Sequence, residues 1–501
     1  MIRKSDRILV GRYVYAVVID AMRTCDALYN KTGDKRYLEE AFYFAEREKA
    51  SVLLSSIAES DAKKFGKIPI NLLNQELNLR KNIARFQSKL ALGKGKNQQD
   101  SLTRANQAYE RLTKRFEKNY SKYAQLKFDI KLATTSKIQT LLAPQTALLE
   151  YTFCRENIYL TVINKNTHQL IRIPKVKQVQ TLLNKYYEVV QGESSLSSFA
   201  PISYQLYQKL IQPAEKYLDG IKKLIVIAPT LESTPFESLL TQLPAKSNKD
   251  DFSRLVYLNN RYQISYHYSA TLWQREFANK KRAAQKKLDF IGYAPFSTGE
   301  SKRYATSRSS GDRLPESGLE VKAIYNLFNK KSLKAEIDLA KTATKESFIQ
   351  NLNKARILHI ASHSEANLKK PGLARVRFAG CGANKKDLSG CLLASEVYNL
   401  AMSTDLLVLS SCSSGVGKLA KGEGVFSLAR SFLYAGAHNI VFSLWDIDDQ
   451  YTKELMVAFY EDFLAQQQSP NYQKALQVAR DKLIKQGIHP KHWAGFVMVG
   501  K

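Results

Sequence analysis

The feature that most constrains the fold is a set of short, mainly apolar runs that are spaced widely along the chain. Two of them, Leu406–Ser411 and residues 439–445, are near-continuous stretches rich in Leu, Val, Ile and Phe. Such runs are typical of strands in a parallel sheet covered on both faces, because a strand with one solvated face alternates apolar and polar side chains. Segments of helical periodicity separate the runs. The sequence therefore predicts an α/β domain with a mainly parallel central sheet.

The expected strands form two series, and each series predicts one half of the α/β domain. The first series comprises residues 147–153, 157–164, 169–173 and 223–228. The second comprises residues 289–293, 357–362, 406–411, 439–445 and 495–499. We therefore place the first half at residues 135–284 and the second half at residues 285–501.

The segment before residue 135 is predicted to be all α-helical. Residues 13–133 contain a single proline, Pro69, and their apolar residues recur at helical spacing. Thr32-Gly33-Asp34 separates two helices that resemble about one and a half tetratricopeptide repeats. We expect residues 1–60 to form these repeat-like helices, either as part of a longer array or as a cap on the next domain. Residues 61–134 are expected to form a long α-hairpin.

The formal net charge of +30, taken alone, favours an acidic partner such as nucleic acid. The 76 Lys and Arg residues are dispersed along the chain, however, and are interleaved with 46 Asp and Glu residues. No segment combines clustered basic and aromatic residues as nucleic-acid-binding modules do. A solvated basic surface is therefore favoured, and direct nucleic-acid binding stays a separate hypothesis.

No run of the sequence approaches the roughly 18 uncharged apolar residues that a membrane-spanning helix needs. The basic start of the chain is not followed by a signal-peptide pattern. We therefore expect no membrane association and a cytoplasmic location.

The cysteines are odd in number and show neither the close pairs of a zinc site nor a disulfide framework. They are Cys25, Cys154, Cys381, Cys391 and Cys412. We expect reduced thiols, with no special role for Cys381 or Cys391. Neither a metal nor a cofactor is predicted.

One histidine and one cysteine follow two of the predicted strands directly. His363 comes after the run 357–362, and Cys412 comes after Leu406–Ser411. The carboxyl ends of parallel strands meet at one edge of a sheet, where reactive groups are usually found. A thiol beside an imidazole supplies a nucleophile and a base that titrates near neutral pH. In caspases the histidine precedes the cysteine by about 50 residues, and the spacing here is similar, although the local caspase motif is absent.

Several motifs around this pair resemble the CHAT family, caspase-like domains that are related to separases and occur with tetratricopeptide repeats. The motifs are Leu358-His359-Ile360-Ala361-Ser362-His363, Val408-Leu409-Ser410-Ser411-Cys412, Gly422-Glu423-Gly424-Val425, Leu428-Ala429-Arg430, Phe432-Leu433-Tyr434-Ala435-Gly436-Ala437, Ser443-Leu444-Trp445, Ile447-Asp448-Asp449, Ala228-Pro229 and Pro235-Phe236-Glu237-Ser238-Leu239-Leu240. The resemblance implies a caspase-like fold with a non-catalytic first half and an active second half. It also implies that Cys412 and His363 are the catalytic dyad.

The resemblance further implies an oxyanion hole built from the backbone amides of Ser364 and Cys412. Members of such families usually have Gly after the catalytic histidine, whereas this chain has Ser364. A serine can donate the same amide only if its backbone reaches the geometry that Gly adopts freely. We interpret the neighbouring His359 as structural, because it lies four residues before His363 on the same predicted strand.

Asp446 and Asp448 follow the predicted strand 439–445 and are candidate substrate-binding residues. The likeness to separases implies that acids here bind a basic residue before the cleaved bond. Asp448 is also a natural N-cap for a helix at 450–466, which would explain this acid without any substrate. Both interpretations stay open.

The sequence thus predicts a cysteine endopeptidase that cleaves a protein substrate through His363 and Cys412. A regulatory protein bound to the helical segment is expected to control it. The alternative is a catalytically silent scaffold that recruits partner proteins, which Ser364 favours.

Overall fold

The computed structural model describes most of the α/β region and part of the helical segment. The described residues are 4–49, 98–120, 132–228, 234–245, 250–278, 286–297, 314–365, 374–381, 389–397, 400, 402–411, 418–420, 424–426, 428–466 and 471–500, with short stretches between 69 and 86. The chain divides into two compact units, Met1–Val14 with Ala50–Leu132 and Tyr15–Lys49 with Ala133–Lys501.

The smaller unit is helical where the structure describes it. Helix α5 spans Gln98–Asn119 and is amphipathic. Its buried Leu112 and Phe116 pack with Leu72, as expected of helices that share an apolar stripe. The predicted turn of the α-hairpin, at residues 93–97, lies outside the described residues.

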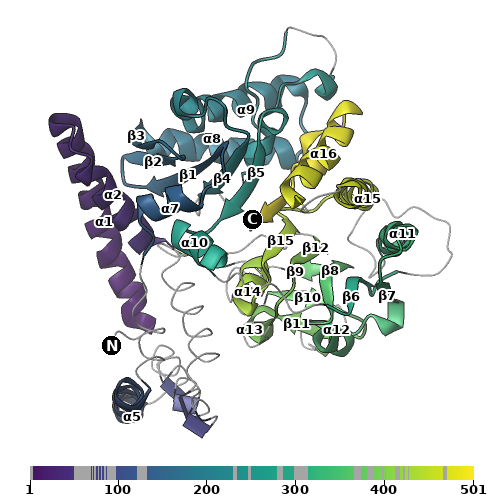
Figure 1. Cartoon of the computed structure of the whole chain (residues 1–501), viewed down its shortest axis with the longest axis horizontal. Coiled ribbons are helices and arrows are strands. Elements are labelled where there is room, and N and C mark those ends of the chain that lie inside the picture. Colours follow the sequence, from purple (N-terminus) through teal and green to yellow (C-terminus); the bar gives the residue numbers. More distant parts are fainter. Residues whose placement is uncertain are drawn as a thin grey trace. The chain divides into compact units, whose positions relative to one another are not determined.

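The larger unit is built on a sheet of eleven strands within the described residues, in the order β3-β2-β1-β4-β5-β16-β15-β12-β8-β6-β7 (Figure 1). The strands are β1 (Thr146–Phe153), β2 (Asn157–Ile163), β3 (His168–Pro174), β4 (Lys223–Ile227), β5 (Gln263–His267), β6 (Leu288–Ala294), β7 (Ala335–Leu339), β8 (Ala355–Ser362), β12 (Leu406–Ser411), β15 (Asn439–Ser443) and β16 (Phe496–Val499). The pairs β3–β2, β2–β1 and β16–β15 are antiparallel, and the other neighbours are parallel. The predicted fold class, a mainly parallel α/β domain after a helical segment, is confirmed.

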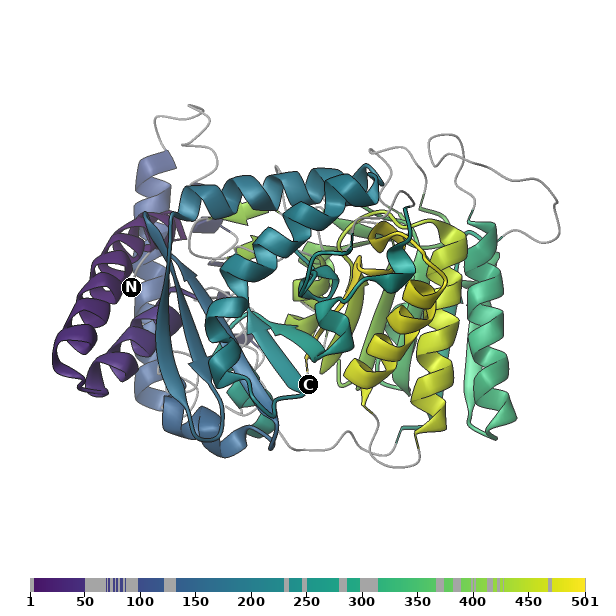
Figure 2. The ribbon, with the colours of Figure 1, turned by 90° about the horizontal axis from the view of Figure 1, so that it is seen from above.

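Helices cover the sheet on both faces, which explains the near-continuous apolar runs of its central strands. They are α7 (Thr135–Leu141), α8 (Val176–Gln191), α9 (Leu196–Leu210), α10 (Ala270–Ala278), α11 (Pro315–Lys330), α12 (Lys345–Asn351), α13 (Ala394–Val397), α14 (Leu428–Ala435), α15 (Asp449–Ala465), α16 (Tyr472–Lys485) and α17 (Pro490–Trp493). Helices α11, α15 and α16 lie side by side over one face of the sheet, with α11 packed on β6 and β8 and α16 on β5 (Figure 2). Every residue of β12 and β15 is buried.

Strand β16, near the carboxyl end of the sequence, joins the two series of strands into one sheet. It lies between β5 and β15, parallel to the first and antiparallel to the second. Val499 is in register with Tyr266 of β5, so β16 connects strands that are far apart in the sequence. The sequence analysis missed β5 and β7, because both are short and mix polar with apolar residues.

Helices α1 (Lys4–Thr32) and α2 (Arg36–Glu48) are separated at the predicted break. Gly33 has a left-handed φ of 69°, which a residue without a Cβ adopts readily and which ends α1. The side chain of Asp34 accepts a hydrogen bond from the amide of Arg36 at 2.9 Å. The break therefore has the local chemistry expected from Thr32-Gly33-Asp34.

Buried polar contacts fix α2 to the sheet. Lys49, at the end of α2, forms an ion pair of 2.7 Å with Glu150 of β1, and both side chains are almost fully buried. Glu46 accepts hydrogen bonds from the first two amides of α10, those of Ala270 and Thr271. Since a helix N-terminus favours a negative charge, this contact stabilises α10 as well as the attachment of α2.

Candidate active site

His363 lies directly after β8, at the edge of the sheet where its parallel strands end. Its imidazole packs edge to face against the ring of Phe296, with the centroids 4.8 Å apart. Strands β8 and β12 pair in parallel, with Ser362 opposite Ser411. Cys412, the residue after Ser411, lies outside the described residues. The structure therefore describes one member of the predicted dyad and the two paired strand ends that precede both members.

A small cavity of about 20 Å³ lies at the same edge of the sheet. It is lined by Leu314, Ser317, Glu320, Ser362, Ser410, Ser411, Ser443, Ile447, Asp449, Thr452 and Phe496. The buried hydroxyls of Ser410 and Ser411 have no hydrogen-bond partner among the described residues.

Two carboxylates, Glu320 and Asp449, give this cavity a negative character. The sequence analysis identified neither as a site residue. Glu320 comes from α11, and its place at the end of β8 and β12 depends on how α11 packs, which no local motif reveals. Asp449 appeared in the sequence analysis only within the motif Ile447-Asp448-Asp449, and in the structure it begins α15.

His359 is fully buried on β8 and is held on both ring nitrogens. Its Nε2 lies 2.8 Å from Oε1 of Glu320, and its Nδ1 lies 3.2 Å from the hydroxyl of Tyr460 on α15. Burial, and next the charge of Glu320, raises the pKa of Tyr460 far above its usual value, so this hydroxyl stays protonated. His359 thus ties β8 to α11 and α15, which agrees with its interpretation as a structural residue.

Ser364 begins the short strand β9 (Ser364–Glu365), which lies in a separate three-stranded sheet with β10 (Arg375–Arg377) and β11 (Cys391–Leu393). It is buried and in register with Val376 of β10. It is not among the described residues with a positive φ. The backbone after His363 therefore holds a serine without the strain that would require Gly.

Asp446 and Asp448, the two predicted substrate-binding acids, are next in sequence to the cavity-lining residues Ile447 and Asp449. Neither of the two lines the cavity itself. Asp448 is exposed and accepts a hydrogen bond from the amide of Gln450 at 2.9 Å, so the predicted capping of α15 is confirmed. Asp446 is exposed and lies near Tyr187 of α8. Burial, and next the charge of Asp446, raises the pKa of Tyr187.

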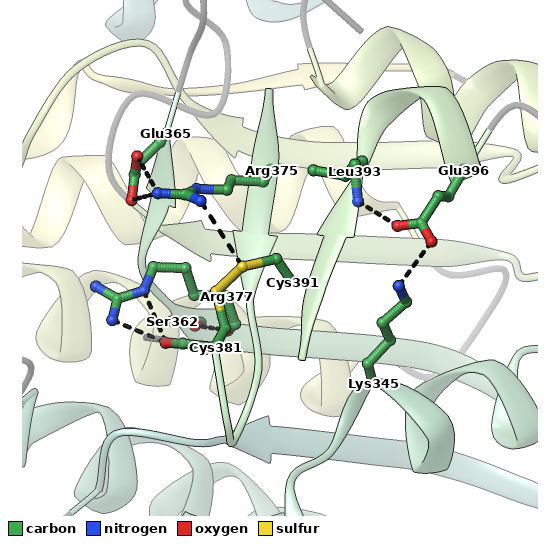
Figure 3. The surroundings of a disulfide bond; sticks show 9 residues. All are labelled: Lys345, Ser362, Glu365, Arg375, Arg377, Cys381, Cys391, Leu393 and Glu396. Atoms are coloured by element: carbon green, nitrogen blue, oxygen red, sulfur yellow. Dashed lines mark hydrogen bonds and ion pairs between the residues drawn. A yellow bond between two sulfur atoms is a disulfide. The ribbon is translucent and has the colours of Figure 1, made fainter. Parts of the chain in front are cut away.

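Cys381 and Cys391 form a disulfide, so the prediction that they are unpaired thiols was wrong (Figure 3). They are ten residues apart, and the antiparallel pairing of β10 with β11 brings their Cα atoms to 5.0 Å. The register of two three-residue strands is set by tertiary contacts and leaves no pattern in the sequence. Disulfides persist mainly in oxidising compartments, so this bond does not favour the predicted cytoplasmic location.

Among the described residues, no group of three or more His, Cys, Asp and Glu side chains is arranged to hold a metal ion. In the same part of the chain, no helix combines the length and the apolar character that crossing a bilayer requires.

The CHAT domain family model matches residues 200–501. Two curated relatives, the mouse and human proteins named tetratricopeptide repeat protein 28, are each 27% identical over 32% of this chain. The match covers only 8% of the length of those relatives.

Among solved structures, the Saccharomyces cerevisiae separase–securin complex matches with a TM-score of 0.46 and 10% identity, over 93% of this chain and 41% of that chain. The complex of the pro- and mature domains of RgpB from Porphyromonas gingivalis matches with a TM-score of 0.36 and 11% identity, over 65% of this chain and 76% of that chain.

Proposed function

Because this chain belongs to the CHAT domain family, we propose that it is a cysteine endopeptidase with Cys412 and His363 as its catalytic dyad. The observation that carries the proposal is the register of β8 and β12, in which Ser362 is opposite Ser411. These two residues directly precede His363 and Cys412 in the sequence. Neighbouring strands lie about 4.8 Å apart, so side chains that follow paired strand ends are within reach of each other. A nucleophile and its base need that proximity.

In the proposed reaction, His363 takes the proton from the thiol of Cys412, and the thiolate attacks the carbonyl carbon of the substrate. The amides of Ser364 and Cys412 stabilise the oxyanion of the tetrahedral intermediate. The imidazolium then gives its proton to the leaving amine, which leaves a thioester on Cys412. Water hydrolyses the thioester, and the thiol and the imidazole are restored.

We further propose that the substrate carries a basic residue before the cleaved bond. Glu320 and Asp449 line the cavity at this edge, and Asp446 and Asp448 follow β15 at the same edge. Such a set of carboxylates favours a cationic side chain.

The first half of the α/β region, residues 135–284, is proposed to be non-catalytic, and residues 285–501 to carry the reaction. A regulatory protein is proposed to bind the helical segment. The Lys49–Glu150 ion pair supports this role, because it links α2 directly to the sheet of the first half. A scaffold without peptidase activity is the rival function, and the curated tetratricopeptide relatives are compatible with it.

The peptidase proposal is tested by incubating the purified chain with a peptide library and identifying products by mass spectrometry. Products are expected with the wild type, and none with Cys412→Ala. A second measurement compares alkylation of Cys412 in the folded chain with alkylation of a free peptide of the same local sequence. No cleavage, together with alkylation no faster than in the free peptide, would support the scaffold.

Asp446→Asn and Asp448→Asn test the recognition of a basic residue. Each change removes one negative charge, and Asn at position 448 keeps the N-cap of α15. We expect kcat/KM for a peptide with Arg before the cleaved bond to fall about fivefold in at least one variant, as for loss of a partly exposed ion pair worth about 1 kcal/mol. A matched peptide with norleucine in place of Arg is the control. An equal loss on both peptides would exclude charge recognition by these acids.

A further inference from the structure

The backbone of Arg377 is hydrogen-bonded to both His363 and the residue before it, Ser362. The amide of Arg377 donates a hydrogen bond to the carbonyl oxygen of His363 at 3.0 Å. The hydroxyl of Ser362 donates to the carbonyl oxygen of Arg377. The end of β8 is therefore joined to both the amide and the carbonyl of Arg377, the last residue of β10, so a shift of Arg377 moves the backbone of His363.

The side chain of Arg377 also reaches the imidazole of His363, through one aromatic ring. The guanidinium carbon of Arg377 lies 4.9 Å from the ring centroid of Phe296. The imidazole of His363 packs edge to face on the same ring, with 4.8 Å between centroids. A guanidinium over an aromatic face is a favourable contact, so Arg377 holds the ring against which His363 rests.

The guanidinium of Arg377 is in turn held by a disulfide-bonded residue. Its Nε and Nη2 donate to the carbonyl oxygen of Cys381, at 3.3 and 2.9 Å (Figure 3). Cys381 is joined to Cys391, which is in register with Arg377 on the neighbouring strand. Arg377 is 6% exposed, and its side chain is enclosed with these partners. The disulfide therefore fixes the carbonyl that orients Arg377.

We propose that Arg377 is a positioning residue for His363 and that the Cys381–Cys391 disulfide clamps Arg377 in place; this rests on the proposed role of His363 as the catalytic base. Contacts run from the disulfide through the Cys381 carbonyl, Arg377 and Phe296 to the imidazole. These contacts limit the orientation of the His363 imidazole. The position of this imidazole relative to the Cys412 thiol sets the rate of proton transfer between them.

Two readouts test this proposal, and the first of them does not depend on any reaction of Cys412. The first is the NMR spectrum of the imidazole nitrogens over a pH series, with ¹⁵N-labelled histidine and His363→Gln to assign its signals among those of the seven histidines. The second is the alkylation rate of Cys412 over the same pH range. Arg377→Met is expected to alter the tautomer pattern and titration curve of His363, and to lower the alkylation rate about 10- to 100-fold.

Arg375→Met is the matched control. Arg375 lies on the same strand, is 4% exposed and binds Glu365 through two contacts of 3.0 and 2.8 Å. Its Nη1 also lies 3.9 Å from Sγ of Cys391, so Arg375 touches the disulfide but, among the described residues, contacts neither the Cys381 carbonyl nor Phe296. Arg375→Met should match Arg377→Met in lost thermal stability, and leave the His363 titration curve and the pH profile of alkylation unchanged.

Two further variants distinguish the contribution of the Arg377 guanidinium from that of the Cys381–Cys391 disulfide. The double variant Cys381→Ala and Cys391→Ala keeps Arg377 and removes the bond, and it should shift the His363 spectrum in the same direction as Arg377→Met but by less. Arg377→Lys keeps the cation and loses the forked contact with the carbonyl, so it should recover only part of the alkylation rate.

The outcomes distinguish this proposal from the proposed function. If alkylation depends on His363 and neither readout changes in Arg377→Met beyond the change in Arg375→Met, the positioning role is overturned and the dyad stands. If the His363 spectrum changes as expected but alkylation never depends on His363, the positioning contact stands and the peptidase proposal fails. If the double cysteine variant leaves both readouts at wild-type values, the disulfide is not the clamp.

Discussion

His363→Ala is expected to lower kcat/KM for peptide cleavage by about 10²- to 10⁴-fold, the usual contribution of a positioned general acid and base. Without the imidazole, a thiol of ordinary pKa is mostly protonated near neutral pH, and the leaving amine receives no proton from the enzyme. The activity lost should increase as the pH falls below the thiol pKa, where the base is needed most. Rates measured from pH 5.5 to 9 give both the size and the pH dependence of the effect.

His438→Ala is a matched control for this experiment. His438 is 43% exposed and directly precedes β15, so it lies at the opposite edge of the sheet from His363. Its Nδ1 is 3.7 Å from Asp405, an exposed contact worth little. It should keep nearly full activity. A His363→Ala variant as active as His438→Ala would show that the imidazole of His363 takes no part in catalysis.

Arg480→Ala is expected to lower the free energy of unfolding by about 3 to 5 kcal/mol, the usual result of removing one partner from a buried ion pair. Arg480 of α16 pairs with Glu237 at 2.9 Å, and the two side chains are 1% and 0% exposed. Its Nη2 also donates to the carbonyl oxygen of Phe496 on β16 at 2.7 Å. The variant leaves the charge of Glu237 buried without its cation. It also removes a contact next to the junction between β5 and β16.

Lys482→Ala, two residues further along α16, is the comparison for that variant. Lys482 pairs with Glu461 at 3.5 Å, and both side chains are about half exposed, so its loss should cost at most about 1 kcal/mol. Urea unfolding of both variants measures the difference. The double variant Arg480→Met with Glu237→Gln should recover part of the lost stability, because it leaves no buried charge unpaired. Equal losses in Arg480→Ala and Lys482→Ala would show that the buried pair does not hold this junction.

The Arg480–Glu237 pair also explains a motif that the sequence analysis could only compare with a family. Glu237 belongs to Pro235-Phe236-Glu237-Ser238-Leu239-Leu240, and it accepts a hydrogen bond from the hydroxyl of Tyr266 at 2.6 Å. Gly436, in another of the quoted motifs, has a φ of 113° and leaves no room for a Cβ, which would lie 2.3 Å from the carbonyl oxygen of Met402. The residues of both motifs were visible in the sequence, but their partners were not.

The sequence by itself determined the features that depend on local patterns. Unbroken apolar runs predicted β12 and β15, because strands buried on both faces need apolar residues at every position. Gly33 and Asp448 marked a helix end and a helix start, since those roles need a left-handed φ and a side-chain acceptor. His363 was named from its position after a predicted strand and Ser364 from the family resemblance, and both follow the end of β8 in the structure.

Only the tertiary structure decided which distant segments meet. The insertion of β16 between β5 and β15, the cavity carboxylate of Glu320 and the Cys381–Cys391 bond all depend on pairing register or helix packing. Local propensity does not encode these choices, because they follow from the joint burial of surfaces contributed by residues far apart in the chain. Arg377 is the clearest case: in the sequence it is one of 76 basic residues, and only the folded chain places it between a disulfide and His363.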